Sequence, residues 1–224
     1  MTHLSRLSVY QTIRNVPLVP VFYHPDAEVC AGVLAACYRA GVRAFEFTNR
    51  GDFAHERFAD LSRQCARDFP DLALGAGTIL DASTAALYLQ LGADFIVGPT
   101  FSEEVARVCN RRKVAYLPGC GTLTEITTAH EWGVEIVKVF PGEVLGPGFI
   151  KSLSGPLPFA SAMVTGGVEP NHESLAKWFG AGAVAVGMGS QLFPKSVLAD
   201  RDFDTIETTV RDVVRIIAEL TTAR

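Results

Sequence analysis

The sequence predicts an α/β protein folded as a single (β/α)8 barrel, a TIM barrel, with an N-terminal extension. The whole chain, residues 1–224, is expected to form one domain. Two observations carry this prediction. Eight short apolar runs alternate with longer amphipathic stretches, and strands that are apolar on both faces are typical of a parallel sheet covered by helices. Four glycines also recur at spacings that each fit a pair of β–α units.

The candidate strands are short and rich in valine, alanine and phenylalanine. In chain order they are residues 16–22, 42–48, 72–77, 94–98, 114–119, 135–140, 162–167 and 183–189. Pro17 and Pro20 weaken the first of them, because proline cannot donate a hydrogen bond to a neighbouring strand. The segment before the first strand is the N-terminal extension. It has no apolar run of the kind found in signal peptides, so none is expected.

Helices are expected between the strands, and several have recognisable starts. Asp81 and Ser102 are placed to cap helices, and Thr122 with Glu125 forms a capping-box pattern. The last helix has a clear apolar face, and a second capping-box pattern is expected at its start. That pattern is Asp204 with Glu207, and the apolar face consists of Ile206, Val210, Val213, Val214 and Ile217.

Gly41, Gly92, Gly133 and Gly182 each stand where a helix should end, one or two residues before a strand, as C-terminal capping glycines do. Their three spacings of 51, 41 and 49 residues each hold two β–α units, and four glycines with one for each pair of units give eight units. An open doubly wound sheet is the competing architecture. It is less favoured because the first strand–helix turn, residues 22–26, contains no glycine.

Composition places the chain among globular proteins and excludes several classes of partner. Hydrophobic residues make up 48% and charged residues 20%, as in ordinary folded domains. The net charge is −4 and the longest basic cluster spans residues 111–113, so we expect no nucleic-acid partner. No apolar run approaches the length of a membrane span. The five cysteines form no CxxC pair, which favours reduced thiols in a cytoplasmic protein.

Two charged residues lie inside otherwise apolar strands. Glu46 and Lys138 each follow a capping glycine by five residues, on the second and sixth strands. Alternate strands of a (β/α)8 barrel contribute side chains to common interior layers, so the two side chains should share one layer and face each other across the barrel. Two other interpretations stay open: a buried structural ion pair, or a side chain that points outward between helices.

A lysine in this position suggests imine chemistry. Burial in an apolar wall favours the neutral amine over the ammonium, and such an amine forms a Schiff base with a carbonyl substrate. Glu46 would move protons between carbon and oxygen, with substrate or water between it and the amine. Arg50, four residues further on, has the planar fork that suits a substrate carboxylate. Thr78, after the third strand, is a candidate for a second contact to that carboxylate.

Glycine-rich loops follow the last two strands. They contain Gly166 and Gly167 after the seventh strand, and Gly187, Gly189 and Ser190 at the end of the eighth. Barrels of this class often bind phosphate with backbone N–H groups from these two loops, and glycine lets the backbone approach closely. We therefore expect a phosphate subsite here. The alternative is a pair of ordinary tight turns.

No metal site is expected, because the histidines show no HxH or HxxxH spacing. His24, at the end of the first strand, is a candidate substrate contact. Cys120 lies at a strand end, but no histidine is spaced to activate its thiol. We therefore expect Cys120 to be inert.

Five motifs together resemble one known family. They are EFTNR at 46–50, GAGT at 75–78, LPGCGT at 117–122, VKVFP at 137–141 and TGGV at 165–168. In unbroken order over about residues 16–194, they are similar to the class I 2-keto-3-deoxy-6-phosphogluconate (KDPG) and 4-hydroxy-2-oxoglutarate (KHG) aldolases. The lysine-bearing VKVFP segment is the most specific of the five.

The resemblance implies roles for residues already singled out. Lys138 would form the Schiff base, and Glu46 would act as general acid and base. The other implied positions are the carboxylate ligands Arg50 and Thr78, the pocket-lining Pro99 and Phe140, and the phosphate ligands Gly166, Gly167 and Ser190.

The implied reaction cleaves a phosphorylated 2-keto-3-deoxy sugar acid to pyruvate and glyceraldehyde 3-phosphate, in a homotrimer and without a metal or other cofactor. KHG is a further expected substrate. The segments at 118–125, 145–151 and 187–190 are similar to the branch that acts on 2-keto-3-deoxy-6-phosphogalactonate (KDPGal). Three other functions stay open: a phosphate-binding isomerase or decarboxylase without an imine, a metal-dependent aldolase, and a sugar-phosphate sensor without turnover.

Overall fold

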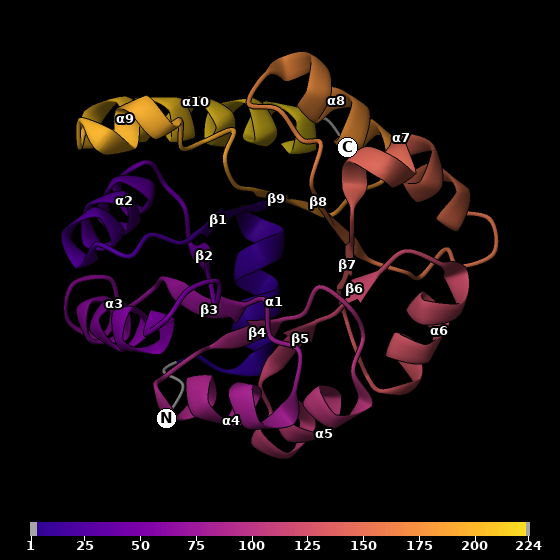
Figure 1. The fold of residues 1–224 in the computed structure, drawn as a ribbon. Coiled ribbons are helices and arrows are strands. Elements are labelled where there is room, and N and C mark those ends of the chain that lie inside the picture. The colour runs from indigo at the N-terminus through magenta and orange to yellow at the C-terminus, as the bar shows by residue number, and fades with distance from the viewer. Residues whose placement is uncertain (1–3, 223–224) are drawn as a thin grey trace.

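The computed structural model describes residues 4–222 and has the expected parallel barrel (Figure 1). In this part of the chain, nine parallel strands form one sheet in the order β5-β4-β3-β2-β1-β9-β8-β7-β6. Their bounds are β1 Leu18–Phe22, β2 Ala44–Thr48, β3 Ala73–Gly77, β4 Phe95–Val97, β5 Ala115–Leu117, β6 Gly119–Cys120, β7 Val137–Val139, β8 Ala162–Thr165 and β9 Ala185–Met188.

The ninth strand arises because the predicted fifth strand is divided in two. β5 pairs with β4 and β6 pairs with β7, and Pro118 lies between β5 and β6. Proline has no N–H to donate to a ladder, although its carbonyl still accepts from the Lys138 N–H at 2.8 Å. The barrel closes across this interrupted segment, so the prediction of eight β–α units is confirmed.

Helices follow the strands and form an outer ring (Figure 1). Their bounds are α2 Ala27–Arg39, α3 Ala54–Asp68, α4 Ala82–Gln90, α5 Glu103–Arg112, α6 Leu123–Glu131, α7 Gly142–Leu153, α8 His172–Ala181, α9 Lys195–Ala199 and α10 Phe203–Thr222. The side chains of Asp81, Ser102 and Thr122 cap α4, α5 and α6 as predicted. The four repeat glycines all have positive φ, between 75° and 111°, which is the conformation that a capping glycine adopts.

The start of the last helix differs from the prediction. The cap is Asp202, whose carboxylate accepts the Thr205 N–H at 3.0 Å and the Thr205 hydroxyl at 2.6 Å. Asp204 lies inside the first turn and Glu207 binds Arg39 at 2.6 Å, so the expected capping box is wrong. A cap must stand just before the helix to reach the free N–H groups. Of the predicted apolar face, four residues are buried and the fifth, at position 214, is half-buried.

Helix α1, Arg6–Asn15, is the N-terminal extension, and it covers one end of the barrel (Figure 1). Tyr10 and Ile13 are buried against inward-facing strand side chains. Arg14 donates to Ser161 Oγ at 2.7 Å, just before β8 begins. The N-terminal end of the barrel is therefore closed, which leaves the C-terminal ends of the strands for ligands.

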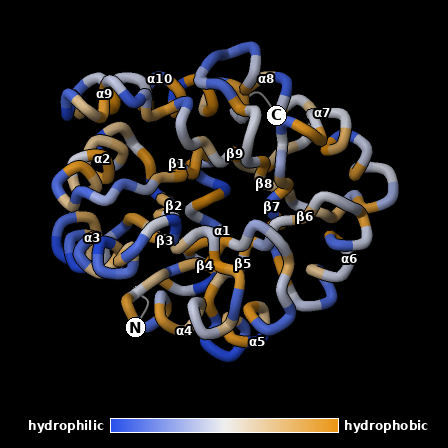
Figure 2. Tube along the Cα trace, viewed as in Figure 1, coloured by the Kyte–Doolittle hydropathy of each residue, from blue (hydrophilic) through white to orange (hydrophobic). Residues whose placement is uncertain are grey.

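The apolar residues form two layers, one inside the barrel and one between the barrel and its helices. Figure 2 shows the strands and the inner helix faces as mainly hydrophobic and the outer faces as hydrophilic. Within residues 4–222, no helix combines the length and the apolar character that a bilayer crossing requires.

Candidate active site

Glu46 on β2 and Lys138 on β7 lie side by side in the barrel interior. Lys138 Nζ is 3.8 Å from Glu46 Oε1, and the two residues are 3% and 0% exposed. This separation is too long for a hydrogen bond, and neither carboxylate oxygen of Glu46 has a hydrogen-bond partner. We expected substrate or water between the two groups. That expectation is wrong, because two long side chains from facing strands meet directly.

Small neighbours make room for this pair. Glu46 is in register with Gly75 on β3, and a side chain at Gly77 would collide with the Glu46 carboxylate. On the other strand, Lys138 Nζ lies 5.1 Å from the centre of the Phe140 ring. The ring stabilises the amine when the amine is charged. When the amine is neutral, it faces the ring as an apolar surface. The GAGT and VKVFP motifs thus shape one compartment.

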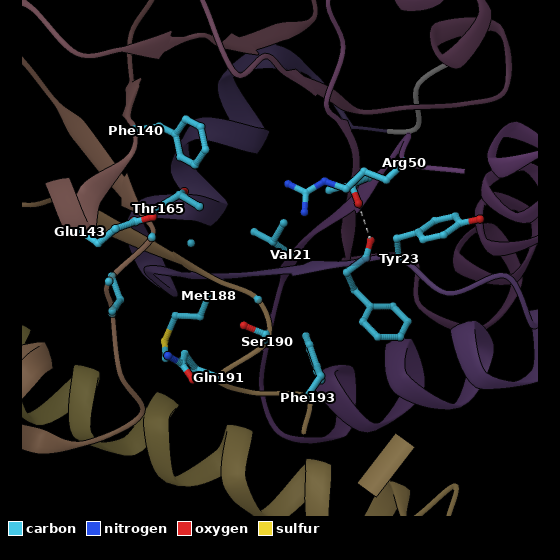
Figure 3. A pocket seen from close by; sticks show the side chains of 17 residues that line it. Val21, Tyr23, Arg50, Phe140, Glu143, Thr165, Met188, Ser190, Gln191 and Phe193 are labelled. Carbon is cyan, nitrogen blue, oxygen red and sulfur yellow. Dashed lines mark hydrogen bonds between the residues drawn. The ribbon is translucent and has the colours of Figure 1, made fainter. Parts of the chain in front are cut away.

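Arg50 and Thr78 lie next to each other at the ends of β2 and β3. Arg50 Nε donates to Thr78 Oγ1 at 3.2 Å. Thr78 has a φ of 61°, a conformation that is uncommon for a β-branched residue and is concentrated at functional sites. The loop that carries Arg50 is held by α4, because the Tyr88 hydroxyl donates to Asn49 Oδ1 at 2.9 Å. In Figure 3 the Arg50 guanidinium points into the cavity.

A cavity of about 720 Å³ opens at the C-terminal end of the barrel (Figure 3). Of the predicted site residues, its lining includes Arg50, Phe140, Gly166, Gly167, Gly187, Gly189 and Ser190. Glu46 and Lys138 lie outside the lining, with the lysine amine against the Phe140 ring. Thr78 is beside Arg50 and also outside the lining. Pro99 does not line this cavity; its carbonyl packs against Gly119, where a side chain would collide with it.

Several lining residues were not singled out from the sequence, among them Thr48, Thr165, Glu143 and Gln191. The hydroxyl oxygen of Thr165 is buried and has no hydrogen-bond partner. Thr48 stands two residues after Glu46, so strand periodicity places it on the same inward face and would have identified it. Glu143 and Gln191 belong to no such pattern, because their places depend on how the loops fold.

The two glycine loops that line the cavity contain free backbone donors. The N–H groups of Gly167, Val168, Ser190 and Gln191 donate to no protein acceptor within the described chain. Gly166 and Gly167 have φ values of 93° and 68°, a left-handed turn that glycine adopts without strain. Backbone N–H groups gathered in such a turn form a site for an anion.

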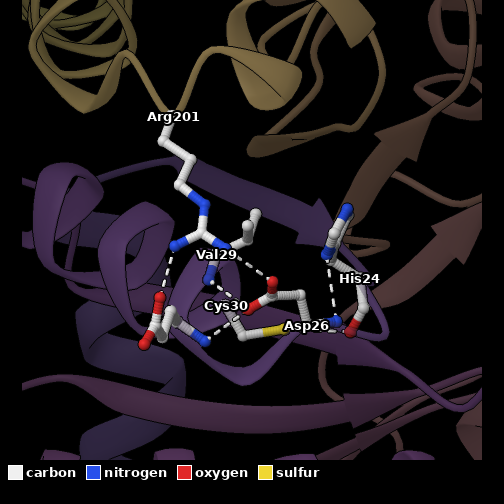
Figure 4. A network of polar contacts seen from close by, with 6 residues as sticks. His24, Asp26, Val29, Cys30 and Arg201 are labelled. Atoms are coloured by element: carbon white, nitrogen blue, oxygen red, sulfur yellow. Dashed lines mark hydrogen bonds and ion pairs between the residues drawn. The ribbon is translucent and has the colours of Figure 1, made fainter.

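His24 and Cys120 make local contacts. His24 Nδ1 accepts the Asp26 N–H at 3.1 Å, and Arg201 binds the Asp26 carboxylate at 2.8 Å (Figure 4). His24 is not part of the cavity lining. Burial raises the pKa of the Cys120 thiol to about 12, with Glu125 adding to the effect, so the thiol is protonated at neutral pH. Over residues 4–222, no three His, Cys, Asp or Glu side chains converge as metal ligands would.

Enzymes built on this barrel carry their chemistry at the C-terminal ends of the strands. A buried amine beside a carboxylate at that end, with an arginine and a glycine turn lining the cavity beyond, is an arrangement that suits barrel enzymes acting on carbonyl compounds. Comparison with known proteins then identifies the family. The sequence profile of the KDPG and KHG aldolases matches residues 9–209, and the chain belongs to this family. It is an aldolase, a carbon–carbon lyase.

Individual relatives agree with this assignment. A 2-dehydro-3-deoxy-phosphogluconate aldolase of Pseudomonas aeruginosa is 34% identical over 207 residues, which cover 92% of this chain and 90% of the relative. A 2-dehydro-3-deoxy-6-phosphogalactonate aldolase of Escherichia coli is 39% identical over 121 residues, 54% of this chain and 58% of the relative. The solved structure of a 4-hydroxy-2-oxoglutarate/2-dehydro-3-deoxyphosphogluconate aldolase has a TM-score of 0.79 and 28% identity, covering 92% of this chain and 97% of that one.

Proposed function

We propose that this aldolase works through an imine on Lys138 and cleaves KDPG or a close phosphorylated analogue to pyruvate and glyceraldehyde 3-phosphate. The observation that carries the proposal is the position of Lys138 and Glu46 inside the barrel, 3.8 Å apart and almost inaccessible to solvent. The proposed reaction needs a nucleophilic amine and a proton carrier within reach of the same carbon atoms. These two side chains supply both.

The proposed reaction needs one proton to move between Lys138 and Glu46, which lie 3.8 Å apart. A buried ion pair is stabilised only when further hydrogen bonds satisfy its remaining polar atoms, and both Glu46 oxygens lack such bonds. The first step of the proposed reaction uses the pair with that proton on Glu46, as an amine beside a carboxylic acid. The amine is the nucleophile for C2 of the keto acid, and the acid can protonate the departing oxygen.

In the proposed cycle, the amine adds to the C2 carbonyl, and Glu46 protonates the resulting hydroxyl, which leaves as water. The protonated imine then withdraws electrons from the C3–C4 bond. Glu46, now a carboxylate, removes the proton of the C4 hydroxyl, the C3–C4 bond breaks, and its electron pair forms the C2–C3 double bond of an enamine. Glu46 returns its proton to C3, and water hydrolyses the imine to release pyruvate and the free amine.

The two ends of the cavity suit the two anionic ends of such a substrate. Arg50, which points into the cavity (Figure 3), and Thr78 would hold the C1 carboxylate. The N–H donors after β8 and β9 would hold the distal phosphate, with the Ser190 hydroxyl facing the same space. A volume of about 720 Å³ lies within the usual range of small-molecule sites.

The test is pyruvate release, followed through lactate dehydrogenase, from KDPG, KDPGal and KHG in parallel. We expect KDPG to be cleaved faster than KHG at low concentration, because only a phosphorylated acid reaches the distal donors. KDPGal is the second candidate, favoured by the 39% identity to the Escherichia coli enzyme over 121 residues. If none of the three yields pyruvate, the proposed reaction is wrong and the isomerase or decarboxylase alternative gains support.

We also infer that the enzyme is a cytoplasmic homotrimer. All five cysteines are free and buried, in keeping with a reducing compartment. Phe53, Leu80 and Leu87, from the α3–α4 side of the barrel, are 67%, 59% and 41% exposed, and exposed apolar side chains on neighbouring elements suit a subunit contact. Light scattering should give three times the chain mass of 24.1 kDa. A mass equal to that of one chain would contradict the inference.

A further inference from the structure

We propose that Trp178 is a positioning residue for the phosphate end of the substrate. Its indole N–H holds the carbonyl of Gly167 away from the cavity and thereby aims the next backbone N–H into it. This inference rests on the proposed function, because it explains how the distal anion subsite is kept in a binding geometry.

The Trp178 side chain connects the outer helical ring to the glycine turn. Trp178 lies on α8 and is 3% exposed. Its Nε1 donates to the carbonyl oxygen of Gly167 at 3.3 Å. Gly167 has a φ of 68° and lines the cavity. Trp178 is not among the residues that line this cavity, so it contacts the turn from outside the cavity.

The geometry of the peptide unit explains how the hydrogen bond from Trp178 to Gly167 affects the next backbone N–H. A trans peptide is planar, and its carbonyl and its N–H point in opposite directions. The Gly167 carbonyl and the Val168 N–H belong to one peptide unit, so a carbonyl turned toward α8 turns the Val168 N–H toward the cavity. Val168 is among the residues that line the cavity, and the residue as a whole is 2% exposed.

The glycine turn has a cavity on each side, which is why it needs support. A second cavity of about 430 Å³ lies behind it, lined by Gly167 and Trp178 among others. Glycine tolerates both signs of φ, so the peptide after Gly167 can adopt the reverse orientation if nothing holds it. In that orientation a carbonyl oxygen would face the phosphate and repel it. The indole N–H selects the orientation that presents a donor.

The proposed role of Trp178 predicts different effects on KM and on kcat. Loss of the indole bond weakens only the hold on the phosphate, so we expect KM for a phosphorylated substrate to rise about 5- to 10-fold, the scale of one neutral hydrogen bond. The chemistry at Lys138 is unaffected, so kcat should stay within twofold. KHG carries no phosphate, so both of its constants should be unchanged.

The experiment uses Trp178→Phe, which keeps a ring in the core and removes the N–H. The matched control is Trp132→Phe, the same change at the end of α6, where the ring contacts Arg107 and lies outside the main cavity. A KM increase for KDPG alone, in Trp178→Phe alone, is the expected result. Equal KM increases for KDPG and KHG, or no increase for KDPG, would overturn the proposal.

A second measurement does not depend on how well Trp178→Phe folds. The chain has two tryptophans, so the Trp132→Phe protein reports on Trp178 alone. Titration with glyceraldehyde 3-phosphate, and separately with inorganic phosphate, should give a saturable change in its fluorescence. A flat signal at concentrations that inhibit turnover would contradict the proposal.

Failure of this inference can be distinguished from failure of the proposed function. Pyruvate and borohydride should label Lys138 in the wild type and in Trp178→Phe alike. Labelling of both with an unchanged KM for KDPG refutes only the role of Trp178. Absence of label in the wild type refutes the imine mechanism itself.

Discussion

Buried polar groups are hydrogen-bonded at one end of the barrel interior and lack hydrogen bonds at the other. At the N-terminal end, α1 closes the opening, and the Tyr10 hydroxyl donates to the Tyr116 carbonyl at 3.4 Å. At the C-terminal end, the oxygens of the Glu46 carboxylate and of the Thr165 hydroxyl are buried without a hydrogen-bond partner. An unpaired buried polar atom costs about 1–3 kcal/mol. This cost falls at the C-terminal end of the barrel, where a bound ligand can supply the missing hydrogen-bond partner.

This contrast predicts a division of labour along the barrel axis. Substitutions at the closed end should lower the free energy of unfolding and leave catalysis unchanged. Substitutions at the open end should impair catalysis and leave the free energy of unfolding unchanged or slightly raised. Variants at each end, measured for both properties, test the division.

The largest effect is expected from Lys138→Met. Removal of a covalent nucleophile should lower kcat by about 10⁴-fold or more. Methionine has a similar volume and keeps the barrel interior filled, so the folded state should persist. Pyruvate release gives kcat, and circular dichroism with a thermal scan gives the fold. Residual activity above about one per cent would show that another group forms the imine.

The opposite behaviour is expected from Ile13→Ala at the closed end. Ile13 is fully buried between α1 and the strands, and loss of its buried methyl groups should cost about 2–5 kcal/mol of unfolding free energy. Urea unfolding measures this loss. The folded protein should keep its kcat and KM for KDPG, and a fall in kcat at full folding would break the proposed separation of the two ends.

A smaller effect is expected from Arg50→Lys. Lysine keeps the charge and loses the fork that binds a carboxylate in two places, so KM should rise by about 10- to 100-fold, the scale of a hydrogen bond to a charged group. Arg63→Lys on α3, where the side chain pairs with Asp60 at 2.9 Å on the surface, is the control and should leave KM unchanged. An equal response of both variants would exclude a specific carboxylate contact.

The smallest effect concerns Cys120, which lies at the open end but is buried. Its thiol pKa is raised to about 12 by burial, so only about one molecule in 10⁴ carries a thiolate at pH 8. That fraction grows tenfold with each pH unit, so native protein should resist iodoacetamide at pH 8 and react faster as the pH rises. Mass spectrometry counts the labels, with urea-unfolded protein as the positive control. Rapid labelling at Cys120 with loss of activity would contradict this expectation.

The sequence was sufficient for features that depend on local pattern. The capping glycines were visible because a helix end needs a positive φ, and Glu46 and Lys138 stood out because charges are rare in apolar strands. The break at Pro118 and the true cap at Asp202 were missed, although each follows a local rule.

Other features depend on tertiary placement, and local pattern does not contain them. Trp178 lies eleven residues from Gly167 in the chain, and only the packing of α8 joins them. Pro99 was expected in the pocket wall, but the path of its loop places it against Gly119. The direct approach of Glu46 to Lys138 likewise depends on the width of the closed barrel.

The central claim is that the buried amine of Lys138 bonds covalently to a keto acid. It is tested most directly by incubating the protein with pyruvate and borohydride, then mapping modified lysines by mass spectrometry. We expect one N-carboxyethyl group, on Lys138, and none on the exposed Lys177. An unmodified Lys138, or label spread evenly over the surface lysines, would contradict it.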